Sequence, residues 1–370
     1  MRELTDGATA ICRGALAAGC DFFAGYPITP ASQILMTMMR ELPKVGGVAV
    51  QGEDEIASIG MCIGATMAGA RALTATSGPG MSLYSESIGL AIMGEVPLVI
   101  VDVQRLGPAT GGATTVAQGD VQFARWGTAG GYPLIVLAPS SIPECYTLTA
   151  RAFALAERFR CPVLLLTDKE LNLTANTVDL EDYGPAPDVP PRVAPELGDG
   201  KPYRYRPASD VVPLSTYGIG TRLRFTGSTH DEGAIITKNP ATVEALNLHL
   251  VAKIEAHLAE IEMAVSDRQE EATTLVVSFG VTAGAMRQAV RRHRAAGQRV
   301  SSLTLQSLWP FPERALARAL AGHRRVVVAE LNLGQVRREV ERLAGGREVV
   351  GVHRIDGELI SPQQIEEALR

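Results

Sequence analysis

Short apolar runs that alternate with longer helix-like segments are the feature that most constrains the fold of this 370-residue chain. They extend from the start of the chain to about residue 168. Apolar strands that alternate with helices imply a parallel sheet covered on both faces. We expect strands at residues 21–26, 47–50, 72–76, 98–103, 134–138 and 163–167, and helices at residues 30–42, 53–70, 81–93 and 142–159.

The composition changes between about residues 173 and 240, where proline, glycine and polar residues crowd together. This pattern predicts an extended arm rather than a domain. A helix-like segment at residues 240–263 then leads into a second alternating series, which predicts a smaller open α/β domain. Its strands are expected at residues 274–280, 299–305, 325–330 and 348–354, with helices at 283–295, 312–321 and 336–343. We therefore divide the chain into an α/β domain, an arm with its connecting helix, and a second α/β domain, at residues 1–175, 176–268 and 269–370.

The bulk composition excludes several classes of partner. A formal net charge of −5 with 20% charged residues is ordinary for a globular protein and does not favour nucleic acid. No stretch approaches the roughly 20 apolar residues of a membrane span, and no signal segment opens the chain, so we expect a cytoplasmic protein without a membrane partner. The cysteines lie singly in apolar surroundings, a pattern that does not predict a zinc or iron–sulfur site: Cys12, Cys20, Cys62, Cys145 and Cys161.

Ligands of open parallel sheets gather at the carboxyl ends of the strands, so the turns after the strands are the candidate sites. The first turn, GYPITP at residues 25–30, is locked by two prolines before a helix. It places the hydroxyl of Thr29 and the neighbouring amides at a helix N-terminus, where an anion is favoured. The alternative interpretation is a rigid turn in which Thr29 is a simple N-cap.

The second turn, QGEDE at residues 51–55, places carboxylates before a helix of small residues. Acids in a first turn are stabilised by the helix dipole, which is the structural explanation. A helix so rich in glycine and alanine also implies close packing, however, and the acidic end then lies near a partly dry surface. There, Glu53 could share a proton with a heterocycle.

The third turn, SGPGMS at residues 77–82, has glycines on either side of a proline. Gly78 and Gly80 let the backbone approach a ligand closely, although a tight turn alone would need the same residues. The fourth turn is Gln104-Arg105, which leads into the loop at residues 107–120. Arg105 can bind a carboxylate through two parallel hydrogen bonds; the alternative is a surface arginine beside a loop.

Taken together and in order, these turns resemble the α subunits of 2-oxoacid:ferredoxin oxidoreductases, most closely the 2-oxoglutarate type, with the 2-oxoisovalerate type as a neighbour. The resemblance covers nearly the whole chain. It rests on YPITP (26–30), QGEDEIAS (51–58), TSGPG (76–80), QRLGP (104–108), QGD (118–120), TG (226–227), HDEG (230–233), WPFP (309–312) and ELNLGQ (330–335).

The resemblance implies the fold and the roles of particular residues. The first domain would be a doubly wound, pyrimidine-type thiamine-diphosphate-binding domain, and the second would be transketolase C-terminal-like. Glu53 matches the catalytic glutamate that bonds the ring nitrogen of the cofactor's aminopyrimidine. Ile28, Thr29, Gly78 and Gly80 would border the cofactor as well. Thr29 and Arg105 match ligands of the 2-oxoacid, and Thr114 falls where the family tunes side-chain preference.

The resemblance also implies the reaction and the partners. A 2-oxoacid, most closely 2-oxoglutarate, would be decarboxylated oxidatively with coenzyme A to acyl-CoA and carbon dioxide, and the electrons would pass to ferredoxin. The family's diphosphate is held with Mg²⁺ at a Gly-Asp-Gly motif. The copy at residues 198–200 lies in the arm, so we do not expect a metal site in this chain. Mg²⁺, the diphosphate and an iron–sulfur cluster would be supplied by a β subunit, and γ and δ subunits are further candidate partners.

Several alternatives stay open from sequence alone. One alternative substrate is 2-oxoisovalerate or pyruvate, because the loop reads PATG and then AT where the family often has PSTG and then PT. A non-catalytic assembly subunit would keep the same fold. The presence of Glu53, Thr29 and Arg105 together favours the enzyme. A dinucleotide enzyme is disfavoured because no Gly-x-Gly-x-x-Gly follows the first strand.

Overall fold

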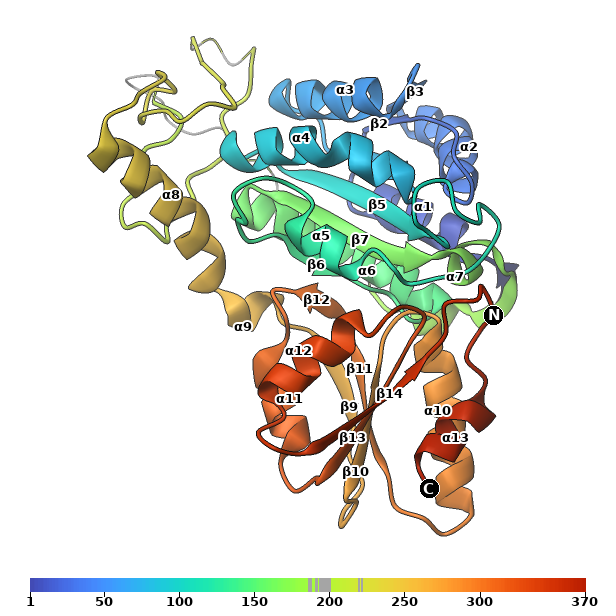
Figure 1. Cartoon of the computed structure of the whole chain (residues 1–370). Helices are drawn as coiled ribbons and strands as arrows, with labels where there is room; N and C mark the ends of the chain where they lie inside the picture. The colour runs from blue at the N-terminus through green and yellow to red at the C-terminus, as the bar shows by residue number, and fades with distance from the viewer. Residues whose placement is uncertain (186–187, 190–191, 193–200, 219, 221) are drawn as a thin grey trace.

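A seven-stranded sheet forms the centre of the larger of two α/β bodies in the computed structural model, which describes residues 1–185, 188–189, 192, 201–218, 220 and 222–370 (Figure 1). The strand order is β12-β6-β7-β5-β4-β2-β3, and all neighbours run parallel except β12 against β6. The strands are β2 (Phe22–Gly25), β3 (Val48–Gln51), β4 (Ala72–Thr76), β5 (Leu98–Gln104), β6 (Ile135–Leu137), β7 (Pro162–Asp168) and β12 (Ser307–Trp309). This confirms the predicted doubly wound parallel sheet.

Helices cover both faces of this sheet because its central strands are apolar on both sides. Every residue of β5 and β7 is buried, as expected for strands between two helical layers. One core lies under α1 (Gly7–Ala17), α2 (Ser32–Glu41) and α6 (Ile142–Phe159). The opposite core lies under α3 (Glu55–Met67), α4 (Pro79–Met93) and α5 (Val121–Trp126). The remaining small elements are η1 (Leu42–Val45), α7 (Lys169–Leu173), η2 (Leu180–Tyr183) and the two-stranded sheet of β1 (Arg2–Thr5) and β8 (Asn176–Asp179).

The second domain contains a five-stranded sheet of order β14-β13-β10-β11-β9, in which only β9 is antiparallel. Its strands are β9 (Ala264–Asp267), β10 (Thr274–Ser278), β11 (Ser301–Leu305), β13 (Arg325–Glu330) and β14 (Glu348–His353). Its helices are α10 (Thr282–Ala295), α11 (Glu313–Leu320), α12 (Gln335–Leu343) and α13 (Pro362–Ala368). Figure 1 shows this domain packed beneath the larger body, as the predicted smaller α/β domain.

The connections between the bodies differ from the expected boundaries. β9 lies before residue 269 but belongs to the second sheet, and β8 lies after residue 175 but pairs with β1. β12 follows β11 of the second domain yet completes the edge of the first sheet beside β6. The pattern of alternating strands could not show this, because a three-residue strand has no periodicity of its own. The two bodies therefore share one hydrophobic core, which contains Val277 as well as Ile100.

The arm between η2 and α8 (Pro240–Glu255) has no regular helix or strand among its described residues. The predicted helix at residues 240–263 is divided into α8 and α9 (Leu258–Ile261). No helix in the described part of the chain is both long and apolar enough to cross a membrane.

A buried charge cluster clasps the arm and α8 to the first domain. Glu95 is 1% exposed, and its Oε2 accepts hydrogen bonds from Nζ of Lys253 at 2.9 Å and Nε2 of His249 at 3.0 Å. Despite its burial, the neighbouring Lys253 and Arg160 hold the pKa of Glu95 well below its usual range. We call Glu95, Lys253, His249 and Arg160 the arm clasp.

The arm clasp binds the arm through backbone carbonyls. Nη1 of Arg160 donates to the carbonyls of Pro202 and Val212, at 3.3 and 3.2 Å. Nδ1 of His249 lies 2.7 Å from the carbonyl of Ala208. The arm is therefore attached by polar contacts of the arm clasp as well as by apolar residues such as Phe225, which packs against the core under α3 and α4.

Candidate active site

The turns selected from sequence follow four neighbouring strands on one edge of the first sheet. The turn with Thr29 follows β2, the turn with Glu53 follows β3, the turn with Gly78 follows β4, and Arg105 follows β5. These strands are adjacent and parallel in the order β5-β4-β2-β3, so their carboxyl ends share an edge. The structure thus gathers the predicted turns where an open parallel sheet binds its ligand.

Arg105 is the side chain that joins these turns. It is 5% exposed, with Nη1 donating to the carbonyl of Thr29 at 2.6 Å and Nη2 donating to the carbonyl of Thr110 at 3.1 Å. Its Nε is buried without a hydrogen-bond partner among the described residues. The alternative of a surface arginine is therefore wrong. A guanidinium has five N–H donors and these bonds use two, so the group keeps donors for an anion.

Gly78 lies beside the arginine, and its backbone conformation favours glycine. Its φ is +42°, and a Cβ atom there would lie 3.7 Å from both Cγ and Nε of Arg105. The side chain of Arg105 therefore passes the Gly78 turn of β4 on its way from β5 to the Thr29 turn of β2. Glycine is favoured at this position because other residues rarely adopt a positive φ. Without a side chain, the backbone of this turn lies close to Arg105.

Gly80 is required by packing inside the chain. A Cβ atom at this position would meet Oγ1 of Thr76 at 1.9 Å and Oε1 of Glu55 at 3.0 Å. Glu55 is buried in the first turn of α3, so Gly80 brings α4 directly against α3. The predicted contact of Gly80 with a cofactor stays a prediction, whereas its role in packing these helices is visible in the structure.

The three carboxylates after β3 have different environments. Asp54 is the N-cap of α3, where Oδ1 accepts from the amide of Ala57 at 2.7 Å. Glu55 is buried beneath Gly80, as described above. Glu53 is exposed and makes no hydrogen bond or ion pair with any described residue. The expected dry surface around Glu53 is therefore not formed by the described part of this chain, and its carboxylate stands free at the sheet edge.

Thr29 and Thr114 are also exposed, whereas Ile28 is half-buried against the core under α1, α2 and α6. Thr29 is not an N-cap, because α2 begins at Ser32 with Ala31 as its cap and no side chain caps it. The alternative interpretation of Thr29 as a simple cap is therefore wrong. Its carbonyl, rather than its hydroxyl, has the visible structural function, since it accepts the bond from Arg105.

Sequence reasoning missed a buried carboxyl pair beside Arg105. Asp102 is completely buried within β5, and its carboxyl lies against the amide of Gly78 and the carboxyl of Asp120. Burial and the neighbouring Asp120 raise the pKa of Asp102 well above its usual range. Burial also raises the pKa of Asp120 to about 6, although the neighbouring Asp102 side chain and the charge of Arg105 both oppose this shift. The two carboxyl groups therefore resist ionising together, and Asp102 is the one whose charged form is disfavoured more strongly. The sequence signal that could have indicated this pair is Asp102, an acidic residue inside the apolar run LVIVDV at residues 98–103.

The raised pKa of Asp120 predicts a pH effect on stability. The folded protein binds this proton more tightly than the unfolded chain, whose aspartate has a value near 3.8. The contribution is fully present below pH 3.8 and is lost as pH rises through about 6. Asp120→Asn should therefore raise the free energy of unfolding at pH 7.5 by about 1–3 kcal/mol, with little gain at pH 4.

Urea unfolding at both pH values checks this expectation. Asp356→Asn is a suitable control, because the Arg354 side chain lowers the pKa of the exposed Asp356 to about 2. An Asp120 variant that gains no stability at pH 7.5 would show that ionising Asp120 at this buried site costs the fold no stability.

Comparison with known proteins agrees with this arrangement. Residues 13–247 match the family described as pyruvate flavodoxin/ferredoxin oxidoreductase, thiamine diphosphate-binding, and residues 272–365 match pyruvate:ferredoxin oxidoreductase core domain II. A 2-oxoglutarate synthase subunit KorA of Methanocaldococcus jannaschii is 42% identical over 99% of both chains. The chain belongs to the 2-oxoacid:ferredoxin oxidoreductase family.

Further members of the family show the same relationship. A ketoisovalerate oxidoreductase subunit VorB of Methanothermobacter thermautotrophicus is 35% identical over the whole of this chain and 97% of its own. The structure of a 2-oxoglutarate:ferredoxin oxidoreductase from Magnetococcus marinus, with 2-oxoglutarate, coenzyme A and succinyl-CoA bound, superimposes with a TM-score of 0.92 at 31% identity. This chain is covered completely in that comparison and spans 64% of the other chain.

A metal site in this chain would need a cluster of His, Cys, Asp or Glu side chains. Among the described residues, no group of three or more His, Cys, Asp or Glu side chains could hold a metal ion. The motif Gly198-Asp199-Gly200, which we do not expect to bind a metal, lies outside the described residues. The five cysteines are buried and unpaired, and burial raises the pKa of each thiol.

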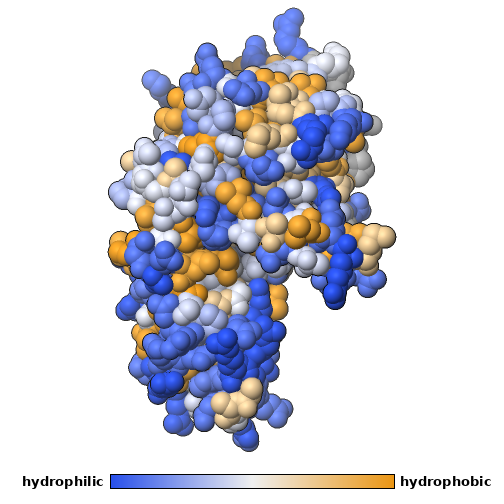
Figure 2. Space-filling model, turned by 90° about the vertical axis from the view of Figure 1, so that its right-hand side faces the viewer, coloured by the Kyte–Doolittle hydropathy of each residue, from blue (hydrophilic) through white to orange (hydrophobic). Residues whose placement is uncertain are grey.

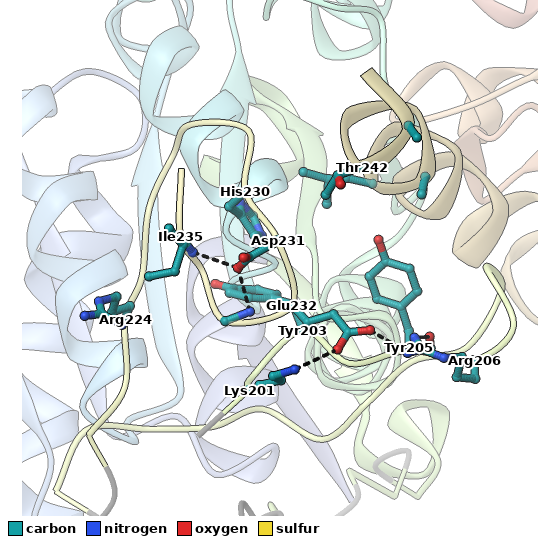
Figure 3. Close-up of a pocket in the computed structure, with 14 residues that line it drawn as sticks. Lys201, Tyr203, Tyr205, Arg206, Arg224, His230, Asp231, Glu232, Ile235 and Thr242 are labelled. Atoms are coloured by element: carbon teal, nitrogen blue, oxygen red, sulfur yellow. Dashed lines mark hydrogen bonds and ion pairs between the residues drawn. The ribbon is translucent and has the colours of Figure 1, made fainter. Parts of the chain in front are cut away.

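A separate cavity of about 650 Å³ lies in the arm, against α8, and not at the edge of the sheet (Figure 3). Glu232 lies at its wall and forms ion pairs with Lys201 at 3.6 Å and with Arg206. Figure 3 also shows Asp231 accepting bonds from backbone amides within its own turn. These polar groups bind arm segments to one another, so the cavity is explained by the folding of the arm.

Proposed function

We propose that this chain is the α-type subunit of a thiamine-diphosphate-dependent 2-oxoacid:ferredoxin oxidoreductase that uses 2-oxoglutarate with coenzyme A. The observation that carries this proposal is the buried Arg105, which joins the turns of β2, β4 and β5 and keeps unused donors. A 2-oxoacid presents a carboxylate beside a carbonyl group, and a fixed guanidinium is suited to bind that pair of acceptors.

The residues present fit one half of the cofactor. Glu53 offers a free carboxylate, and the Gly78 turn offers a backbone without a side chain in the way. When bound, thiamine diphosphate supplies the carbon nucleophile that attacks the 2-keto group. The chain's own contribution is that Glu53 holds a proton at the ring nitrogen of the pyrimidine, while Ile28, Thr29, Gly78 and Gly80 border the ring.

The diphosphate and Mg²⁺ require a partner. Hard oxygen donors suited to Mg²⁺ are not clustered in the described part of this chain, so we place that half of the site on a β subunit. The iron–sulfur cluster that takes the electrons belongs there too, and γ and δ subunits would complete the assembly that serves ferredoxin.

The surface beside Glu53 supports a partner at this position. Gly60 and Gly64 lie exposed along α3, and a Cβ atom on either would meet nothing within 4 Å. Ile56, at the start of the same helix, is 53% exposed. Figure 2, which faces the right-hand side of Figure 1, shows hydrophobic patches on the larger body, whereas the second domain below is mostly hydrophilic. An adjoining chain packed on α3 would remove water from Glu53.

Substrate binding follows from the free donors of Arg105. The guanidinium is fixed by the carbonyls of Thr29 and Thr110, so its remaining N–H groups are oriented before the 2-oxoacid arrives. The exposed Thr29 hydroxyl lies in the same turn and can add a bond to the substrate's carboxylate or carbonyl oxygen. Thr114, exposed in the following loop, would face the substrate's side chain.

Arg105→Lys is expected to lower kcat/KM for the 2-oxoacid about 10- to 100-fold, mainly through KM, because a lysine keeps the charge but loses the fork of donors. Steady-state kinetics of the assembled complex measure this change. Arg125→Lys is a matched control, since Arg125 also donates to two backbone carbonyls, those of Gly131 and Tyr132. Equal losses in both variants would contradict a substrate role for Arg105.

The proposed function is tested by purifying this chain together with the subunits encoded beside it. Reduction of a viologen dye is followed with coenzyme A and a panel containing 2-oxoglutarate, 2-oxoisovalerate and pyruvate. We expect turnover that depends on thiamine diphosphate and is fastest with 2-oxoglutarate. A complex that turns over none of the three acids would refute the proposal, and a preference for 2-oxoisovalerate would correct its substrate.

A further inference from the structure

The loop at residues 107–120 connects β5 to α5 and is called the substrate loop below. It carries Thr114, and the carbonyl of its Thr110 accepts from Arg105. The part of the loop that follows β5 forms a tight turn. In this turn the amide of Leu106 donates to the carbonyl of Thr115, and the amide of Gly112 donates to the carbonyl of Leu106. It contains no helix or strand of its own, so its position depends on what holds it from outside.

Gln118, near the end of the substrate loop, is completely buried and bonded to the second domain. Its amide Nε2 donates to the carbonyl of Phe279 at 3.2 Å, and its Oε1 accepts from Oγ1 of Thr282 at 2.9 Å. The same Oε1 accepts from the amide of Leu331 at 3.1 Å. The backbone amide of Gln118 donates to the carbonyl of Leu331 at 2.9 Å. Such a set of bonds fixes both the side chain and the backbone at this point of the loop.

Asn332 completes this attachment. Its Nδ2 donates to the carbonyl of Gln118 at 2.7 Å, while its Oδ1 accepts from the amides of Gly334 and Gln335. The side-chain NH₂ group of Asn332 therefore holds the loop, and its side-chain oxygen orders the turn in which Asn332 itself lies. Gln335 adds a bond from Nε2 to the carbonyl of Gly119 at 2.6 Å.

Two glycines show that the second domain is shaped to receive the loop. At Gly280, where φ is +57°, a Cβ atom would lie 2.2 Å from Nε2 of Gln118. At Gly357, where φ is +82°, a Cβ atom would lie 2.0 Å from Cγ2 of Thr115. The contacts fall at both ends of the segment that contains Thr115 and Gln118, and side chains at either glycine would displace it.

We infer that the second domain holds the substrate loop in place through Gln118 and Asn332, which makes both of them positioning residues for use of the 2-oxoacid. This inference rests on the proposed function, because it gives the second domain a task at the site proposed above. It also accounts for the ELNLGQ segment at residues 330–335, which holds the loop whose Thr110 carbonyl accepts from Arg105.

Asn332→Asp is the sharpest test, because aspartate keeps the acceptor for the turn and removes the donor to Gln118. Hydrogen–deuterium exchange on the complex should show peptides covering residues 107–117 exchanging at least about 2- to 12-fold faster, because one hydrogen bond is lost and a carboxylate then faces the carbonyl of Gln118. KM for the preferred 2-oxoacid should rise by a similar factor, with the affinity for thiamine diphosphate unchanged in a titration. Gln118→Met should act in the same direction, and it serves if the first variant does not fold.

Arg287→Met is the matched control. Arg287 of α10 also crosses between the domains, where Nη2 donates to the carbonyl of Ser140 at 3.1 Å, but it does not touch the loop. Faster exchange of the loop in this control as well would overturn the inference, because general loosening of the domains would explain it. Unchanged exchange in Asn332→Asp, or faster exchange without a change in KM, would overturn it while the proposed function stands. A wild-type complex without turnover on any 2-oxoacid would refute both.

Discussion

Replacing Glu53 by glutamine in the assembled complex should lower turnover about 10²- to 10⁴-fold, the usual contribution of a positioned proton-transferring group. Glutamine has nearly the same shape, but its amide cannot take up and return a proton at the pyrimidine nitrogen. KM for the 2-oxoacid should change little, because Arg105 and not Glu53 binds that substrate in the proposed site. Single-turnover kinetics with the purified complex separate the chemical step from binding.

Asp54→Asn is the matched control for this prediction. Asparagine is as good an N-cap as aspartate, so α3 keeps its first turn while the same unit of negative charge is lost beside Glu53. We expect near-normal turnover in this control. A Glu53→Gln complex with unchanged turnover would remove the central residue of the proposal, and an equal loss in both variants would assign the effect to charge at the helix end.

Lys253→Met should lower the free energy of unfolding by about 3 kcal/mol, because it leaves the buried carboxylate of Glu95 without its closest cation. His249 still donates to the same oxygen, which limits the loss. The arm should also be cleaved faster by protease between residues 201 and 212, since the arm clasp holds that segment by its carbonyls. Urea unfolding and limited proteolysis measure the two effects.

The double variant Glu95→Gln with Lys253→Met tests the physical cause. It removes both charges from the arm clasp, so most of the lost stability should return if an unpaired carboxylate was responsible. A double variant as unstable as Lys253→Met alone would show that the lysine matters through its packing along α8 and not through its charge.

Much of the fold could be predicted because the central strands of both sheets are mostly apolar. β4, α6 and β13 have the same bounds as the sequence predicted, since each is a clear run of its own period. α1 was missed although Asp6 caps it in the usual way, because small residues blur its apolar spacing. β12 was missed because three residues show no alternation, and a pairing across two domains is a property of the tertiary fold alone.

The candidate site was predictable as a set of turns but not as a set of contacts. Strand order alone brings Thr29, Gly78 and Arg105 to one edge, and the burial of Arg105 depends on which carbonyls the folded loops present. Asp102 could not be paired with Asp120 from sequence, because the residues that separate them form a loop without periodicity. The exposure of Glu53 was not foreseen either, since glycines on α3 predict close packing without saying which chain provides it.

The strand β12 has a practical consequence for anyone dividing this polypeptide. A fragment that stops at residue 268 would lack β12, so β6 would become an exposed edge strand with unpaired amides and carbonyls. Exposed edge strands pair with strands of other molecules and promote aggregation. The hydrogen bonds between β12 and β6 therefore join the two domains, and a hinge motion that separated the domains would break these bonds. For the proposed enzyme, we therefore expect substrates to gain access through movement of surface segments or neighbouring chains rather than through separation of the two domains.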